Sequence, residues 1–91
     1  MVDPYDFQQL CERLWEIYTR KNHDYGDSFR TSLEQFGRMA FVIRANDKME
    51  RLKALAGAAE GKVKDESFQD TTEDLALYCI MMLLDGSDIK Y

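Results

Sequence analysis

The chain has 91 residues, of which 45% are hydrophobic, and its formal net charge is −5. These values predict one globular domain, residues 1–91, and they argue against binding of duplex nucleic acid, which requires a basic surface. No signal peptide or membrane-spanning segment is visible, so we expect a cytoplasmic protein without membrane contact. The two cysteines, Cys11 and Cys79, form neither a zinc motif nor a disulfide framework, and we expect both thiols to be buried.

The first predicted helix begins at Asp3 and Pro4. Aspartate favours the N-cap position, and proline is well suited to the first helical position. Apolar residues then recur at helical spacing as far as Tyr18. We therefore expect this helix to end at about Lys21.

The segment from Arg20 to Phe29 combines turn-forming residues with two cations, a histidine and two aromatic rings. Composition alone favours an ordinary turn in which Tyr25 and Phe29 pack onto the core. The alternative is a loop that holds a small anion and stacks on a ring.

Helical periodicity resumes at about Thr31, which predicts a short helix. Gly37 then marks a break or a close approach between helices, and a long second helix is expected over residues 38–56. The segment 57–65 carries glycines and charged residues, and we expect it to be an exposed connection.

Two carboxylates lie within the long helix. Asp47 interrupts its apolar face, and although Arg44 or Arg51 could neutralise it, this position favours a ligand role. Glu50 lies three residues on, where an ion pair with Lys53 is the simpler explanation.

The last predicted helix, residues 66–84, has an acidic start and an apolar body. Ser67 is the expected N-cap and Gly86 the expected C-cap. The body from Leu75 to Leu84 has no polar side and is too short to span a bilayer, so protein must cover it on every side. We therefore predict an all-α bundle of three main helices and one short helix, completed by a homodimer or a higher homo-oligomer.

Asp70 and Asp74 lie four residues apart on one helical face, where like charges repel by roughly 0.2–0.5 kcal/mol. The first turn of a helix favours an anion and accounts for Asp70. Asp74 lies deeper, at the edge of the apolar body, and requires a basic side chain or a metal. Several carboxylates on two helices suit Mg²⁺, or Mn²⁺ in its place, and the candidates are Asp47, Glu50, Glu66, Asp70 and Asp74.

Three sequence blocks resemble a known family. Residues 21–28 read Lys-Asn-His-Asp-Tyr-Gly-Asp-Ser and resemble its Lys-Asn-x-Asp-Tyr-Gly-x-Ser signature, and residues 44–52 and 65–78 resemble its other two blocks. The family is the small phage and bacterial all-α family named for association with nucleotide modification. It is similar to the MazG-like nucleoside triphosphate pyrophosphohydrolases. The resemblance covers roughly residues 10–84.

The resemblance implies a MazG-like helical oligomer in the cytoplasm of a bacterium or a phage-infected host. It implies an Mg²⁺-dependent pyrophosphohydrolase acting on a nucleoside triphosphate, with a deoxynucleotide as the expected substrate. The implied metal ligands are Asp47, Glu50, Asp70 and Asp74, and Glu66 is the implied catalytic residue, as a further ligand or as the base that activates water. The implied substrate-binding residues are Lys21, Asn22, Asp24 and Tyr25.

One position departs from the pyrophosphohydrolase pattern, because Thr71 stands where a glutamate is expected. Two alternatives therefore stay open beside the enzyme. One is a non-catalytic nucleotide-binding or adaptor module, which needs only the loop and the fold. The other is a helical oligomerisation module, which needs neither the loop nor the carboxylates.

Overall fold

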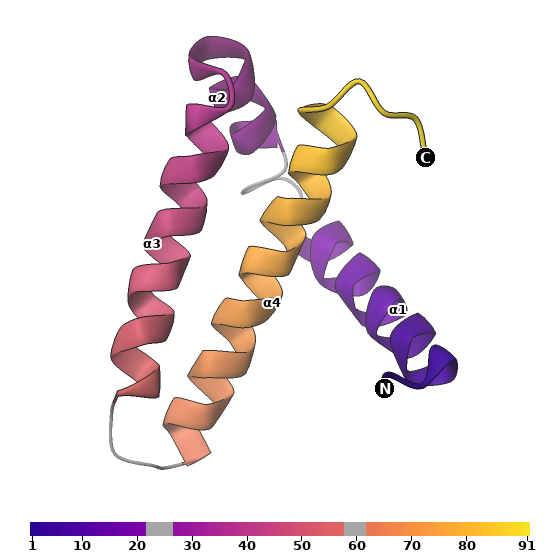
Figure 1. The fold of residues 1–91 in the computed structure, drawn as a ribbon, viewed down its shortest axis with the longest axis vertical. Coiled ribbons are helices and arrows are strands. Elements are labelled where there is room, and N and C mark those ends of the chain that lie inside the picture. Colours follow the sequence, from indigo (N-terminus) through magenta and orange to yellow (C-terminus); the bar gives the residue numbers. More distant parts are fainter. Residues whose placement is uncertain (22–26, 58–61) are drawn as a thin grey trace.

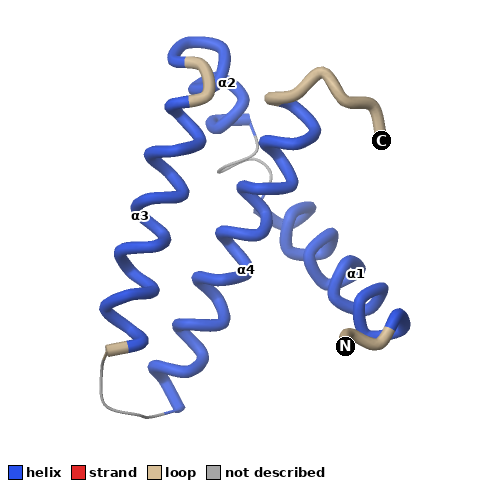
Figure 2. Tube along the Cα trace, viewed as in Figure 1, coloured by secondary structure: helices blue, strands red, loops and turns tan. Residues whose placement is uncertain are grey.

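The computed structural model describes residues 1–21, 27–57 and 62–91, with side chains in the last range described from residue 67. Within these residues the structure is helical, with no strand (Figure 2). The helices are α1 (Pro4–Lys21), α2 (Asp27–Phe36), α3 (Met39–Ala56) and α4 (Lys62–Asp85). The predicted all-α fold of three long helices and one short helix is confirmed.

Helix α4 is the central element. It lies beside α3, and the two helices run in opposite directions (Figure 1). Helix α1 crosses α4 on the side away from α3, and α2 folds back on the upper end of α3. Residues of α4 therefore meet α3 on one side and α1 on another.

Two clusters of buried residues form the core. They are Leu14, Ile17 and Leu77 between α1 and α4, and Phe29, Tyr78 and Met81 between α2 and α4. Phe29 is fully buried and packs edge to face on Tyr78, with ring centroids 5.2 Å apart at 75°. Tyr18 packs against both clusters and so connects α1 to the second one.

Two of the predicted helix boundaries follow from local chemistry. The Asp3 carboxylate accepts a hydrogen bond from the Tyr5 amide at 2.7 Å, which is the expected capping contact at the start of α1. Gly37 has a φ of 67°, a left-handed conformation that glycine adopts without strain. A Cβ there would meet nothing within 4 Å, so Gly37 permits the break between α2 and α3 rather than a close helix approach.

Two predicted boundaries are wrong. Helix α4 begins at Lys62, so Ser67 lies inside the helix and is not its N-cap, and the connection is shorter than 57–65. No glycine or proline interrupts residues 62–85, and therefore nothing in the sequence stops the helix from starting early. Helix α2 likewise begins at Asp27 rather than at Thr31, with an acidic residue in its first turn, where the helix dipole favours an anion.

Both cysteines are exposed, contrary to the prediction of buried thiols. Cys79 belongs to the apolar body of α4, which is not covered on every side within one chain. Ile80, Leu83 and Leu84 also remain exposed, by 39%, 47% and 59%. The prediction assumed that every apolar residue of α4 would find a neighbour, but α1 and α3 cover only part of its circumference.

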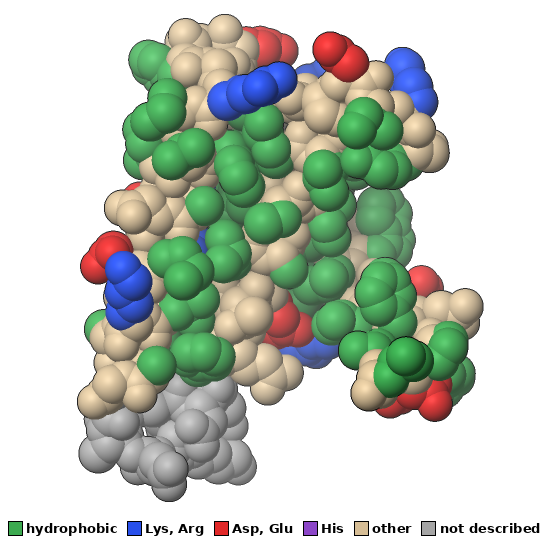
Figure 3. Space-filling view, in the orientation of Figure 1, with side chains coloured by type: hydrophobic (Ala, Val, Ile, Leu, Met, Phe, Trp, Pro, Cys, Tyr) green, Lys and Arg blue, Asp and Glu red, His purple; other side chains and the backbone are tan. Residues whose placement is uncertain are grey.

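Apolar side chains gather over α3 and α4 on the face shown in Figure 3. On these two helices Val42, Met49, Phe68 and Leu83 are between 40% and 48% exposed. Exposed apolar patches on soluble proteins are often sites of interaction with another protein. None of the described helices is long and apolar enough to cross a membrane.

We expect the purified chain to sediment as a dimer or a larger homo-oligomer at micromolar concentration, because an apolar face on α4 lacks cover within the chain. Leu83→Asp places a charge on that face and should shift the chain toward the monomer. Gln35→Asp adds the same charge at an exposed position of α2 and should leave the assembly intact. Sedimentation velocity measures all three, and a monomeric wild type would contradict the prediction.

Candidate functional site

A hollow of about 220 Å³ lies where α1 crosses α4, and its walls are charged. We call it the charged hollow, and its lining residues are Arg13, Ile17, Arg20, Lys21, Asp70, Glu73 and Asp74. Arg13, Ile17 and Arg20 follow each other at spacings of four and three, so α1 presents them on one side. Asp70 and Asp74 share a side of α4 for the same reason. Basic residues thus come from α1 and acidic residues from α4.

Asp74 joins three helices. Its Oδ1 lies 3.8 Å from Nζ of Lys21 at the end of α1, and its Oδ2 lies 3.5 Å from Nζ of Lys48 on α3. The Asp74 side chain is 24% exposed, so the carboxylate is partly removed from water. A carboxylate in this position requires cations. The structure supplies two lysines, where the sequence left open a basic side chain or a metal.

Glu73 is the enclosed member of an ion pair with Arg13, whose own side chain is 52% exposed. Glu73 is 8% exposed. Its carboxylate accepts one hydrogen bond from Nε of Arg13 and a second, at 3.2 Å, from Nη2 of the same guanidinium. This two-pronged hydrogen bonding and the charge of Glu73 raise the pKa of Arg13 above its ordinary value, so the guanidinium stays charged. Sequence analysis did not single out Glu73. The available signal was its spacing of four from Leu77, which faces α1.

Helix α3 contributes two arginines whose partners on α4 and α2 are hydroxyl groups. Nε of Arg51 donates to Oγ1 of Thr71 at 3.1 Å. Nη1 of Arg44 donates to the Tyr78 hydroxyl at 3.1 Å, and Nη2 donates to Oγ of Ser32 at 3.4 Å. Thr71 is 3% exposed and therefore buried. Its hydrogen bond from Arg51 explains why a polar residue occupies this buried position.

The structure brings together three of the residues predicted for the site. Lys21, Asp70 and Asp74 all line the charged hollow. Asp47 and Glu50 do not line it. Asp47 is exposed, without an ion pair to the described part of the chain, and Glu50 pairs with Lys53 at 3.1 Å, as the simpler explanation predicted.

The remaining predicted residues fall outside what the structure describes. Asn22, Asp24 and Tyr25 belong to residues 22–26. The backbone of Glu66 lies within α4, but its side chain is outside the described residues. Their roles stay predictions.

The described side chains contain no group of three or more histidine, cysteine, aspartate or glutamate residues that could hold a metal ion. They therefore supply no cage made by the protein alone. Magnesium is commonly held by one or two carboxylates together with substrate phosphates, and Asp70 and Asp74 offer that donor set in the charged hollow.

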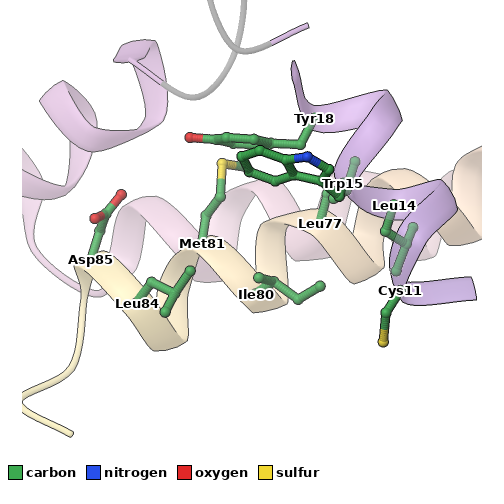
Figure 4. Close-up of a pocket in the computed structure, with 9 residues that line it drawn as sticks. All are labelled: Cys11, Leu14, Trp15, Tyr18, Leu77, Ile80, Met81, Leu84 and Asp85. Atoms are coloured by element: carbon green, nitrogen blue, oxygen red, sulfur yellow. The ribbon is translucent and has the colours of Figure 1, made fainter. Parts of the chain in front are cut away.

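A second cavity lies between α1 and α4 and is mostly apolar (Figure 4). It has a volume of about 240 Å³, and we call it the apolar groove. Trp15 and Tyr18 of α1 stack with ring centroids 6.1 Å apart and lie over Met81 of α4. Asp85 is its one charged lining residue. The charges at the crossing of α1 and α4 are therefore concentrated in the charged hollow.

A family model matches residues 21–85, which is 65 of the 91 residues. The chain belongs to the family described as nucleotide modification associated domain 1. The match includes Lys21 and the whole α4 wall of the charged hollow, whereas Arg13, Ile17 and Arg20 precede it. No curated protein and no solved structure matches the chain. The family description associates the chain with nucleotide modification.

We expect Glu73→Gln to lower the melting temperature by several degrees, because the neutral amide removes the strongest charge interaction of Arg13 and leaves the guanidinium with only the weaker interactions of Asp70 and Glu16. Glu34→Gln is the matched control, since Glu34 is 71% exposed and lies 4.0 Å from Arg30 in a surface pair of little energetic consequence. Thermal unfolding followed by circular dichroism compares the two. Equal changes in both variants would show that the Arg13–Glu73 pair is no more important than a surface pair.

Proposed function

We propose that the chain binds a nucleotide as its Mg²⁺ complex in the charged hollow and hydrolyses a nucleoside triphosphate to the monophosphate and pyrophosphate. The observation that carries this proposal is that Lys21 lines one hollow with Asp70 and Asp74, which lie far from it in the sequence. They are the residues for which we predicted phosphate and metal binding. A deoxynucleotide is our first candidate substrate, in keeping with the family's association with nucleotide modification.

The mixed charge of the hollow supports a metal–phosphate complex over either component alone. Three basic and three acidic side chains line it. A bare phosphate would meet the carboxylates of Asp70 and Asp74, and a bare cation would meet Arg20 and Lys21. A nucleotide carrying Mg²⁺ presents both signs of charge and can satisfy both sets of groups.

Within this proposal the residues have separate roles. Asp70 and Asp74 would hold Mg²⁺, or Mn²⁺, and when bound the ion would neutralise phosphate charge and lower the pKa of a water molecule. Lys21 would bind phosphate, with Asn22, Asp24 and Tyr25 toward the nucleotide. Glu66 would be a further metal ligand or the base that accepts a proton from water.

Asp47 is a better candidate than Glu50 for a further metal ligand. Helical spacing puts Asp47 on the same side of α3 as Arg44 and Arg51, which face α4. Glu50 already pairs with Lys53, so a ligand role for Glu50 requires that exposed pair to separate. A role for Asp47 requires no such change.

A non-catalytic nucleotide-binding or adaptor module is the second candidate. It is favoured by the two lysines that already neutralise Asp74 and by Thr71 in place of the glutamate of the pyrophosphohydrolase pattern. Incubation with each ribonucleoside and deoxynucleoside triphosphate in Mg²⁺, followed by pyrophosphate detection, separates the two. Release of pyrophosphate supports the enzyme, and nucleotide binding without release supports the module. Absence of both would leave an oligomerisation module.

Mg²⁺ with a nucleoside triphosphate should raise the melting temperature of the wild-type chain, because a ligand that binds only the folded state stabilises it. Asp74→Asn should remove most of this increment, since the amide is a weaker metal ligand than the carboxylate. Asp6→Asn makes the same chemical change at an exposed position of α1 and should retain the increment. Differential scanning fluorimetry measures each variant with and without ligand. Equal increments in wild type and Asp74→Asn would exclude Asp74 as a ligand.

Tyr25→Ala should weaken nucleotide binding about ten-fold or more, because a base stacked on an aromatic ring contributes roughly 1–3 kcal/mol. Stabilisation by Mg²⁺ should persist. Tyr5→Ala, at a tyrosine that is 66% exposed near the start of α1, serves as the control. Isothermal titration calorimetry gives both affinities. If Tyr25→Ala unfolds the chain while its folded fraction binds normally, Tyr25 is a core residue and not a nucleotide contact.

A further inference from the structure

The side of α3 that faces α4 carries three cations in succession. We call Arg44, Lys48 and Arg51 the basic row. Spacings of four and three residues keep them on one side of the helix, and the row covers about 10 Å along its axis. Their partners on α4 run in the opposite direction: Tyr78, Asp74 and Thr71. Asp47 lies on the same side of α3, but among the described residues the row forms an ion pair with Asp74 alone.

The two arginines of the row lack an acidic partner among the described residues. A guanidinium has five N–H donors and binds carboxylates and phosphates most strongly. Arg51 uses one donor on Thr71, and Arg44 uses two, on Tyr78 and Ser32. The chain has 17 acidic residues against 12 basic ones, so carboxylates are in excess. The hydroxyl partners orient these cations without neutralising them.

Arg44 is held more rigidly than a surface arginine. Its guanidinium carbon lies 6.0 Å from the centroid of the Phe29 ring and 5.7 Å from that of Tyr78. The rings belong to residues that are buried, so they fix the position of the charge. Arg51 is exposed, and the Lys48 side chain is 29% exposed, so the row can be reached from solvent.

The row is continuous with the charged hollow through one carboxylate. Lys48 contacts Oδ2 of Asp74, while Lys21, which lines the hollow, contacts Oδ1. Arg44 and Arg51 each lie about one helical turn from Lys48. None of the three row residues lines the hollow itself, so a ligand bound there beside Asp74 would be separated from Lys48 by one carboxylate.

We propose that the basic row binds the outer phosphates of a polyphosphate chain and makes the site selective for the number of phosphate groups. The inference rests on the proposed nucleotide site and assigns to it three residues that sequence analysis did not treat as ligands. In the free chain the hydroxyls of Ser32, Thr71 and Tyr78 hold the guanidinium groups in place. Phosphate oxygens use the donors that these hydroxyls leave available, and a single phosphate is too short to reach all of the row.

The test uses ligands without a base, so that it does not depend on which nucleotide is bound. The full chain is titrated calorimetrically with inorganic tripolyphosphate and with orthophosphate, each with and without Mg²⁺. We expect tripolyphosphate to bind at least about ten-fold more tightly than orthophosphate. Arg51→Gln should reduce the affinity for tripolyphosphate about ten-fold and leave the affinity for orthophosphate unchanged. Arg51→Lys keeps the charge but not the planar fork, and should recover part of the loss.

Lys53→Gln is the matched control. It removes one positive charge from the same helix, two residues beyond Arg51 and therefore on another side, where Lys53 is 67% exposed and pairs with Glu50. This variant should bind tripolyphosphate as the wild type does. Circular dichroism confirms that each variant is folded at the titration temperature.

Equal affinity for the two anions, or equal loss in Arg51→Gln and Lys53→Gln, would overturn the inference. Neither result bears on the nucleotide site itself, which the Asp74→Asn comparison tests separately. If nucleotides fail to stabilise the wild type but tripolyphosphate binds through Arg51, the basic row stands as an anion site and the proposed function fails.

Discussion

The carboxylate of Asp74 is the interaction on which the arrangement of the polar residues depends. It lies on the central helix, partly removed from water, and each of its oxygens faces a lysine from a different helix. A carboxylate in this environment is stable only with cations close by. Lys21 lies at the end of α1 and Lys48 in the middle of α3, so one charge connects the crossing of α1 and α4 to the long contact between α3 and α4. The charged hollow and the basic row meet at this point.

Charged and apolar side chains lie on different surfaces of the helices. Charged residues at the crossing of α1 and α4 line the hollow, whereas the apolar groove between the same helices has one charged residue, Asp85. A different face, over α3 and α4, is apolar and exposed (Figure 3). If the proposed assembly and ligand binding both occur, they would use different regions of the domain, and association through the uncharged face would require no desolvation of charges.

Membership in a family associated with nucleotide modification is compatible with the proposal that the charged hollow binds a nucleotide with its metal ion. The departure from the pyrophosphohydrolase pattern also has a structural reason. Thr71 is buried, donates to the carbonyl of Ser67 at 2.7 Å and accepts from Arg51. A glutamate there would neutralise Arg51 within the protein. The threonine instead leaves that positive charge without a carboxylate at this position, as the proposed binding of phosphates by Arg51 requires.

The amino-acid sequence by itself determined the helices, because their signals are local. Asp3 and Pro4 start α1, and Gly37 separates α2 from α3. Periodic apolar residues define α1 and α3, whereas an unbroken apolar run marks the body of α4. It also indicated that Asp74 needs a cation, since its place beside an apolar segment could be read directly. Local signals gave the wrong position for Ser67, because a serine can lie at the N-cap or inside a helix and its side chain alone does not distinguish the two positions.

Only the tertiary structure decided which charges meet. Whether Asp74 would face Lys48, and whether Arg51 would face Asp47 or Thr71, depends on the rotation of α3 about its axis relative to α4. Helical spacing defines the sides of each helix but not which sides pack together. The same holds for Glu73, whose pairing with Arg13 depends on the crossing of α1 and α4, and for Cys79, whose exposure depends on how much of α4 its neighbours cover. Contacts between distant helices are set by packing of the whole core, and no single segment contains that information.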